Sequence, residues 1–87
     1  MSADAAEVPR LILLTRPDCG LCEEMQLELR ALAACAPLPQ LTIVDVDSDP
    51  DLCRRYGLKI PVILLDSIPV CSHRLDAQEL LRLLKRL

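Results

Sequence analysis

Hydrophobic and polar residues form successive blocks along the chain, and each block has the spacing of one kind of element. Residues 11–14 are a continuous aliphatic run flanked by prolines, which predicts a strand buried on both faces. From Gly20 the spacing becomes helical, with Asp18 placed to cap the helix and Pro37 to end it. The apolar face of this predicted helix consists of Leu21, Met25, Leu29 and Leu32.

The next block, residues 40–47, is rich in β-branched residues and predicts a strand with both faces at least partly covered. A short helix is expected after it, over residues 50–57. Pro50 suits the first turn of this helix, and Gly57 suits a left-handed position just after its end. Tyr56 is expected to pack at the end of this helix.

The last part of the chain predicts a β-hairpin followed by a helix. The hairpin joins residues 62–65 to residues 68–71, and Pro69 places the second of these strands at an edge of the sheet. Residues 76–87 begin like a capping box and continue with leucines at helical spacing. The predicted order is therefore β-α-β-α-β-β-α, and its first three elements form a parallel crossover.

Composition limits what a chain with this pattern can be. Its 87 residues make one domain, over residues 9–87, and an aromatic share of 1% leaves an aliphatic core. A net charge of −3 without a basic stretch argues against nucleic-acid binding. No segment is long and apolar enough for a membrane span, and residues 1–8 lack the basic start of a signal peptide. We therefore expect a flexible N-terminus and a cytoplasmic protein.

Two of the five cysteines, Cys19 and Cys22, are separated by two residues at the predicted strand-to-helix turn. This spacing is typical of a thiol pair that opens and closes a disulfide. The alternatives are chance or half of a zinc site. The other potential ligands, Cys35, Cys53, Cys71 and His73, form no second close pair, so we expect no metal. The three remaining cysteines are expected to be small buried hydrophobes and His73 a solvated turn residue.

The start of a helix favours a thiolate, because unpaired backbone N–H groups and the helix dipole face it. Cys19 is therefore the expected nucleophile, and Cys22, shielded by its helix, the expected resolving thiol. Gly20 allows a substrate chain to approach closely. Arg16 favours the Cys19 thiolate, whereas the acidic residues around it oppose the thiolate: Asp18, Glu23 and Glu24.

A second feature lies at the start of the predicted strand 62–65. The Ile60–Pro61 step is a candidate for a cis peptide bond, and an ordinary trans proline is the alternative.

With these motifs in this order, residues 9–87 resemble the thioredoxin superfamily, and most closely the small glutaredoxin-like proteins of bacteria. The resemblance implies an α/β, thioredoxin-like fold: a four-stranded mixed sheet with helices on both faces. It also implies a cis peptide before Pro61, opposite Cys19, where the backbone of Ile60 pairs with an extended substrate. Gly20 and Leu21 replace the Pro-Tyr that typical glutaredoxins carry between the cysteines. The expected substrate-binding residues are Arg16, Gly20, Leu21, Ile60 and Pro61.

The predicted function is that of a thiol–disulfide oxidoreductase, an enzyme that reduces protein disulfides or glutathione mixed disulfides. Residues 72–76 lack the Gly-Gly kink of glutaredoxins and keep one residue of the Asp pair that helps to hold glutathione. Both substrate classes therefore stay open. We expect a monomer without a bound cofactor, with glutathione as one possible reductant. The alternative is a non-catalytic thioredoxin-fold binding module or a metal or iron–sulfur carrier.

Overall fold

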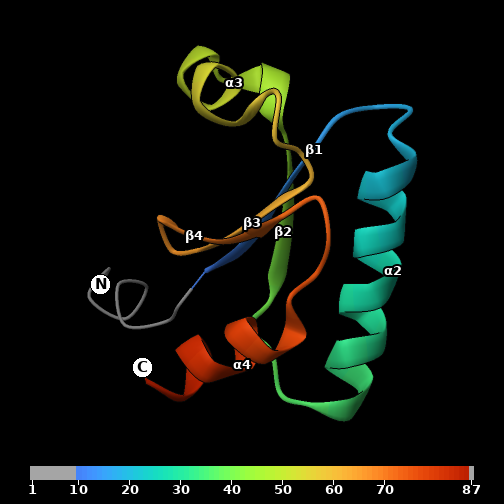
Figure 1. Ribbon diagram of the computed structural model, residues 1–87, viewed down its shortest axis with the longest axis vertical. Coiled ribbons are helices and arrows are strands. Elements are labelled where there is room, and N and C mark those ends of the chain that lie inside the picture. Colours follow the sequence, from blue (N-terminus) through green and yellow to red (C-terminus); the bar gives the residue numbers. More distant parts are fainter. Residues whose placement is uncertain (1–9, 87) are drawn as a thin grey trace.

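The structure, a computed structural model, describes residues 10–86 (Figure 1). The predicted flexible segment, residues 1–8, lies outside the described residues, as does Leu87. The elements follow the predicted order, with an added 3-10 helix, η1, after the second strand. Their bounds are β1 Leu11–Thr15, α2 Gly20–Cys35, β2 Leu41–Asp45, η1 Val46–Ser48, α3 Pro50–Tyr56, β3 Val62–Leu65, β4 Ile68–Ser72 and α4 Ala77–Lys85.

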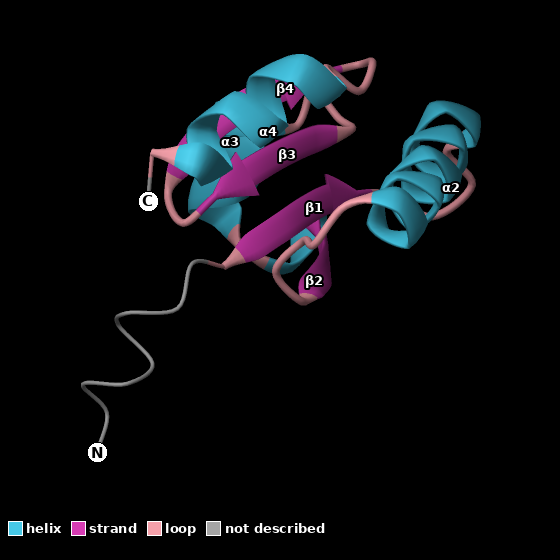
Figure 2. Ribbon diagram, turned by 90° about the horizontal axis from the view of Figure 1, so that it is seen from below, coloured by secondary structure: helices cyan, strands magenta, loops and turns pink. Residues whose placement is uncertain are grey.

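The four strands form one mixed sheet in the order β2-β1-β3-β4, which Figure 2 shows side by side. β1 pairs in parallel with β2 and antiparallel with β3, while β3 and β4 form the predicted hairpin. β4 lies at an edge of the sheet, as Pro69 indicated. Proline has no backbone N–H to donate, and at an edge no second neighbouring strand requires one. The predicted α/β class and mixed four-stranded sheet are confirmed.

Side chains alternate between the two faces of the sheet, so each face has its own apolar cluster. The first cluster packs α2 and α4 against β1 and β3, and the second packs η1 and α3 against the other face. The buried members of the first are Leu11, Leu13, Met25, Leu29, Ile63, Leu65 and Leu80. Those of the second are Leu14, Val46, Val62 and Leu64, with Leu52, Tyr56 and Ile60 partly buried against them. Helices therefore cover both faces.

The second strand is partly covered on both faces, as predicted, since Leu41 packs against the first cluster and Val44 against the second. The cover is incomplete along the strand. β2 is the outer neighbour of β1, and both Thr42 and Ile43 are exposed. An edge strand receives less cover from the helices than the central pair does, and the β-branched composition of residues 40–47 did not distinguish these positions. Only Val46, just beyond the strand, is fully buried among these residues.

The expected left-handed conformation of Gly57 is also wrong, since its φ is −57°. A glycine fits here because of space: a Cβ at this position would lie 2.5 Å from the carbonyl oxygen of Cys53. The same carbonyl accepts a 2.8 Å hydrogen bond from the N–H of Gly57, which closes the end of α3. Close backbone approach, rather than handedness, explains this residue.

Aspartates cap the starts of α3 and α4, and the cap of α4 agrees with the capping-box-like start predicted at residue 76. Asp49 accepts hydrogen bonds from the N–H groups of Asp51 and Leu52 at α3, and Asp76 accepts one from Glu79 at α4. Each cap satisfies donors that the helix itself leaves unpaired. Within residues 10–86 no helix has the length and apolar character needed to cross a membrane.

The packing of α4 on the sheet predicts a large effect of one truncation. Leu80 is fully buried, so Leu80→Ala is expected to lower the free energy of unfolding by about 2–5 kcal/mol, since it removes apolar contacts and leaves a cavity. Leu58 is 98% exposed, and Leu58→Ala is expected to change stability by less than about 0.5 kcal/mol. Urea denaturation of both variants measures the difference, and equal losses would contradict the described packing.

Candidate active site

Cys19 and Cys22 form a disulfide at the start of α2, with their Cα atoms 5.2 Å apart. Cys19 is the N-cap residue of the helix. Its Sγ accepts a 3.2 Å hydrogen bond from the N–H of Cys22, and its carbonyl oxygen accepts one of 3.1 Å from the N–H of Glu23. The first sulfur therefore stands among the unpaired donors of a helix N-terminus.

Asp18, the predicted cap, does not cap the helix. It is in the left-handed region, with φ of 60°, and belongs to the turn that leads into Cys19. The helix starts at Gly20, and its buried residues are Cys22, Met25 and Leu29, while Leu21, in the first turn, is 48% exposed. Leu21 was expected on the inner face, and that prediction is wrong.

The two sulfurs differ in access. Cys22 is 3% exposed, whereas Cys19 is half-buried at the surface end of the helix. Gly20, which directly follows Cys19, is exposed, and a Cβ built there would meet no atom within 4 Å. The space in front of Cys19 and Gly20 is therefore open to another chain, and Leu21 lies exposed beside it.

Ile60 and Pro61 lie at the same end of the sheet as the disulfide. β1 leads into the disulfide turn and β3 starts just after Pro61, and the antiparallel register places Leu14 opposite Val62. The Ile60–Pro61 peptide bond is cis. Pro61 is buried and its carbonyl oxygen accepts a 2.8 Å hydrogen bond from the N–H of His73. The backbone of Ile60 has no hydrogen bond to any backbone group in residues 10–86.

The guanidinium of Arg16 binds a carboxylate and is not a free charge beside the disulfide. Its Nε and Nη2 donate hydrogen bonds of 2.8 and 2.9 Å to the two carboxylate oxygens of Asp47, and its Nη1 donates one of 3.3 Å to the carbonyl of Gly57. The bonds to Asp47 raise the pKa of Arg16 and lower that of Asp47. The hydrogen bonds of the Arg16 guanidinium join the end of β1 to η1 and to the end of α3, and they hold this edge of the site in place.

Cys53 is a neighbour of Asp47, and the sequence did not reveal this contact. Its Sγ–H donates a 3.3 Å hydrogen bond to Asp47, which raises the pKa of the thiol above its ordinary value. Nothing in the local pattern of α3 indicates this contact, because it depends on how α3 docks beside η1. The contact therefore favours the thiol form of Cys53 over the thiolate.

The other cysteines also depart from the expected burial. Cys35 ends α2 and is exposed, so its prediction as a buried hydrophobe is wrong. Cys71 is half-buried in β4, where burial raises the pKa of its thiol. His73 is exposed in the turn after β4. Over residues 10–86, no three His, Cys, Asp or Glu side chains are grouped so that they could hold a metal ion.

Comparisons with known proteins agree with this geometry. The model of the glutaredoxin-like domain (DUF836) family matches residues 10–85. The chain belongs to this glutaredoxin-like family. Comparison with curated proteins finds no match.

Solved structures of the same fold come from several organisms. A Nitrosomonas europaea protein studied by solution NMR is 28% identical, with a TM-score of 0.77 over 88% of this chain and 92% of its own. An X. campestris protein is 31% identical, with a TM-score of 0.61 over 88% of this chain and 97% of its own. Mitochondrial thioredoxin 3 of Saccharomyces cerevisiae, in its oxidized form, is 24% identical, with a TM-score of 0.61 over 91% of this chain and 78% of its own. The last match shows the shared thioredoxin-like fold.

The Asp47 contacts predict a change in the reactivity of Cys53. In Asp47→Asn the carboxylate that raises the pKa of this thiol is gone, and Arg16, which lowers that pKa, loses its ion-pair partner. The thiol pKa should fall, so the thiolate fraction at neutral pH should rise. We expect faster alkylation of Cys53 by iodoacetamide, followed by peptide mass spectrometry. Cys71 serves as the internal control, and a slower or unchanged rate at Cys53 would contradict the assignment.

Proposed function

We propose that the protein is a thiol–disulfide oxidoreductase that reduces protein disulfides or glutathione mixed disulfides. The observation that carries the proposal is the asymmetry of the cysteine pair. Cys19 is half-buried at the helix N-cap, and Cys22 is fully buried in disulfide contact with it. One sulfur is open to a substrate and the other is placed to resolve the adduct. Membership of the glutaredoxin-like family supports the same chemistry.

In the reduced protein, the N–H of Cys22 and the positive end of the α2 dipole favour the thiolate of Cys19. This thiolate attacks one sulfur of the substrate disulfide, forms a mixed disulfide and expels the other sulfur as a thiolate. Cys22 gives its thiol proton to water, and its thiolate then attacks the Sγ of Cys19 and expels the second substrate sulfur. Two electrons pass from the cysteine pair to the substrate, and the two expelled thiolates take protons from water.

The open space at Gly20 and the free backbone of Ile60 support binding of an extended substrate chain. A chain that pairs with the backbone in this way gains main-chain hydrogen bonds that do not depend on its sequence. The exposed side chain of Leu21 offers an apolar contact next to the reacting sulfur. Arg16 contributes through the loop edge that it fixes, because its guanidinium is occupied by Asp47 and Gly57.

Reduction of the Cys19–Cys22 disulfide for the next cycle requires an external dithiol or two thiols. We propose that glutathione or a reductase supplies them. Either donor enters by attack on the accessible sulfur, which is again that of Cys19, since Cys22 is 3% exposed.

The division of roles predicts what single cysteine variants do. Cys22→Ser is expected to accumulate a covalent adduct on Cys19 when it meets a peptide disulfide, because nothing resolves it. Cys19→Ser is expected to form no adduct in this site, and the wild type to turn over and leave no adduct. Intact-protein and peptide mass spectrometry distinguish the three cases. Two results would overturn the proposal. One is an adduct on Cys22 of the Cys19→Ser variant that forms as fast as the adduct on Cys19 of the Cys22→Ser variant. The other is a reduced wild type that does not reduce the peptide.

A further inference from the structure

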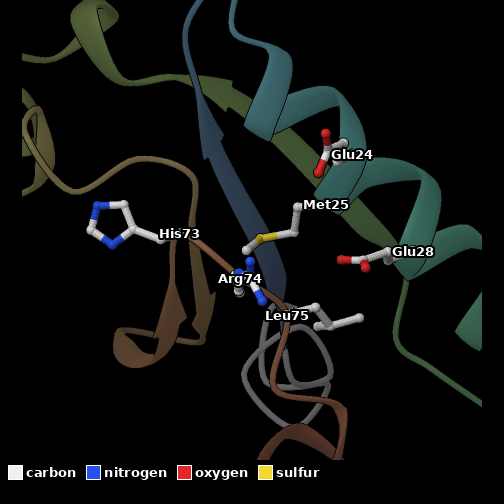
Figure 3. A pocket seen from close by; sticks show the side chains of 6 residues that line it. All are labelled: Glu24, Met25, Glu28, His73, Arg74 and Leu75. Atoms are coloured by element: carbon white, nitrogen blue, oxygen red, sulfur yellow. The ribbon is translucent and has the colours of Figure 1, made fainter.

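A hollow of about 350 Å³ lies between the early part of α2 and the segment that follows β4 (Figure 3). α2 contributes one wall and the turn before α4 contributes the other. The side chains that line it are Glu24, Met25, Glu28, His73, Arg74 and Leu75. This mixture of charged and apolar groups has no part in the disulfide chemistry described above.

The hollow borders the redox site through two connections. Met25 follows Cys22 by three residues on the same buried face of α2. On the other wall, the N–H of His73 donates its hydrogen bond to the carbonyl of Pro61. A substrate joined to Cys19 and lying along Ile60 therefore has this hollow beside it.

The charged side chains of the hollow lack partners among residues 10–86. Glu24 and Glu28 stand one helical turn apart, so their carboxylates repel each other on one side of α2. In Figure 3 both lie on the α2 side, with Arg74 across from them and the ring of His73 turned away. None of the three charged side chains forms an ion pair within the described part of the chain.

Two carboxylates against one guanidinium give the hollow a net negative charge. Asp18, exposed in the turn before α2, is a further acidic residue near the disulfide. Arg16, the cation that precedes the disulfide, is already paired with Asp47 and does not compensate. At the base, Met25 is fully buried, and the half-buried side chain of Leu75 provides the apolar surface for an aliphatic chain.

We propose that this hollow binds a lysine or arginine side chain of the substrate, and that the protein acts on protein disulfides flanked by a basic residue. The aliphatic part of such a side chain lies on Leu75 while its cationic end bridges Glu24 and Glu28. This inference rests on the proposed oxidoreductase function and names its substrate class. Glutathione carries two carboxylates and one ammonium at neutral pH, so the same surface disfavours it.

Arg74 limits the preference, since it opposes a second cation in the hollow. Its replacement therefore strengthens binding of a basic side chain, whereas replacement of the two glutamates weakens it. Glu23 is the matched control on α2. It lies toward a different part of the helix surface, with Gln26, Leu27 and Arg30, and does not line the hollow.

The test compares reduction of peptide disulfides that differ in one residue next to the cysteine: Lys, Ala or Glu, placed one or two positions before or after it. For the wild type we expect kcat/KM to be about two- to fivefold higher for the best Lys peptide than for its Ala counterpart, the size of a partly exposed ion pair. The Glu peptide is expected to be slower than the Ala peptide. The preference should shrink at roughly 0.5 M salt, which screens the charges.

The glutamate double variant, Glu24→Gln with Glu28→Gln, is expected to lose the Lys preference, measured as the ratio of its kcat/KM values for the Lys and Ala peptides. A change in the reactivity of Cys19 alters both values alike and cancels in this ratio. Arg74→Gln is expected to raise the preference, and Glu23→Gln to keep most of it. Equal rates for Lys, Ala and Glu peptides at every position would overturn the substrate class and leave the oxidoreductase function standing. Failure of the wild type to reduce any peptide would instead overturn the proposed function itself.

Discussion

The antiparallel pairing of β1 with β3 at the centre of the sheet is the constraint on which the rest of the structure depends. Leu13 and Ile63 pair in this ladder, and both are fully buried beneath α2 and α4. Because the register is fixed by which side chains reach each face, it also fixes where the segments at the ends of both strands lie. The disulfide turn after β1 and the Ile60–Pro61 step before β3 must share one edge. Strand pairing, rather than proximity in the sequence, brings the cysteine pair and the cis Ile60–Pro61 bond to this edge.

At the start of α2, the two sulfurs of the disulfide differ in their exposure. If the helix were rotated about its axis by the angle of one residue, its apolar residues would turn away from the sheet, so the burial of Met25 and Leu29 fixes its rotation. That rotation sends Cys22 inward and leaves Cys19 at the cap, where its sulfur meets a backbone N–H. The difference in access between the sulfurs is thus a consequence of core packing.

The sequence pattern predicted the element order, the edge position of β4 and the C-x-x-C turn, because each follows from local rules of periodicity and proline chemistry. The prediction from the pattern failed where the conformation or contacts of a residue depend on another residue that is distant in sequence or lies in the next turn. Gly57 is required by the nearby carbonyl of Cys53 and not by a positive φ. Arg16 is drawn to Asp47, 31 residues away, and Cys53 joins the same carboxylate. Asp18 lost the capping role because Cys19 occupies the cap itself.

The same rotation of α2 also links the proposed redox chemistry to the proposed recognition of the substrate. A helix that buries Met25 and Leu29 necessarily carries Glu24 and Glu28 along the border of that buried face, next to the turn that holds Arg74. In so small a domain, with short connections between its strands and helices, there is little added loop to select a partner. Selection then falls to the side chains beside the disulfide. With Arg16 neutralised by Asp47, the free charge on this border is mainly acidic, and a basic partner is the one that it complements.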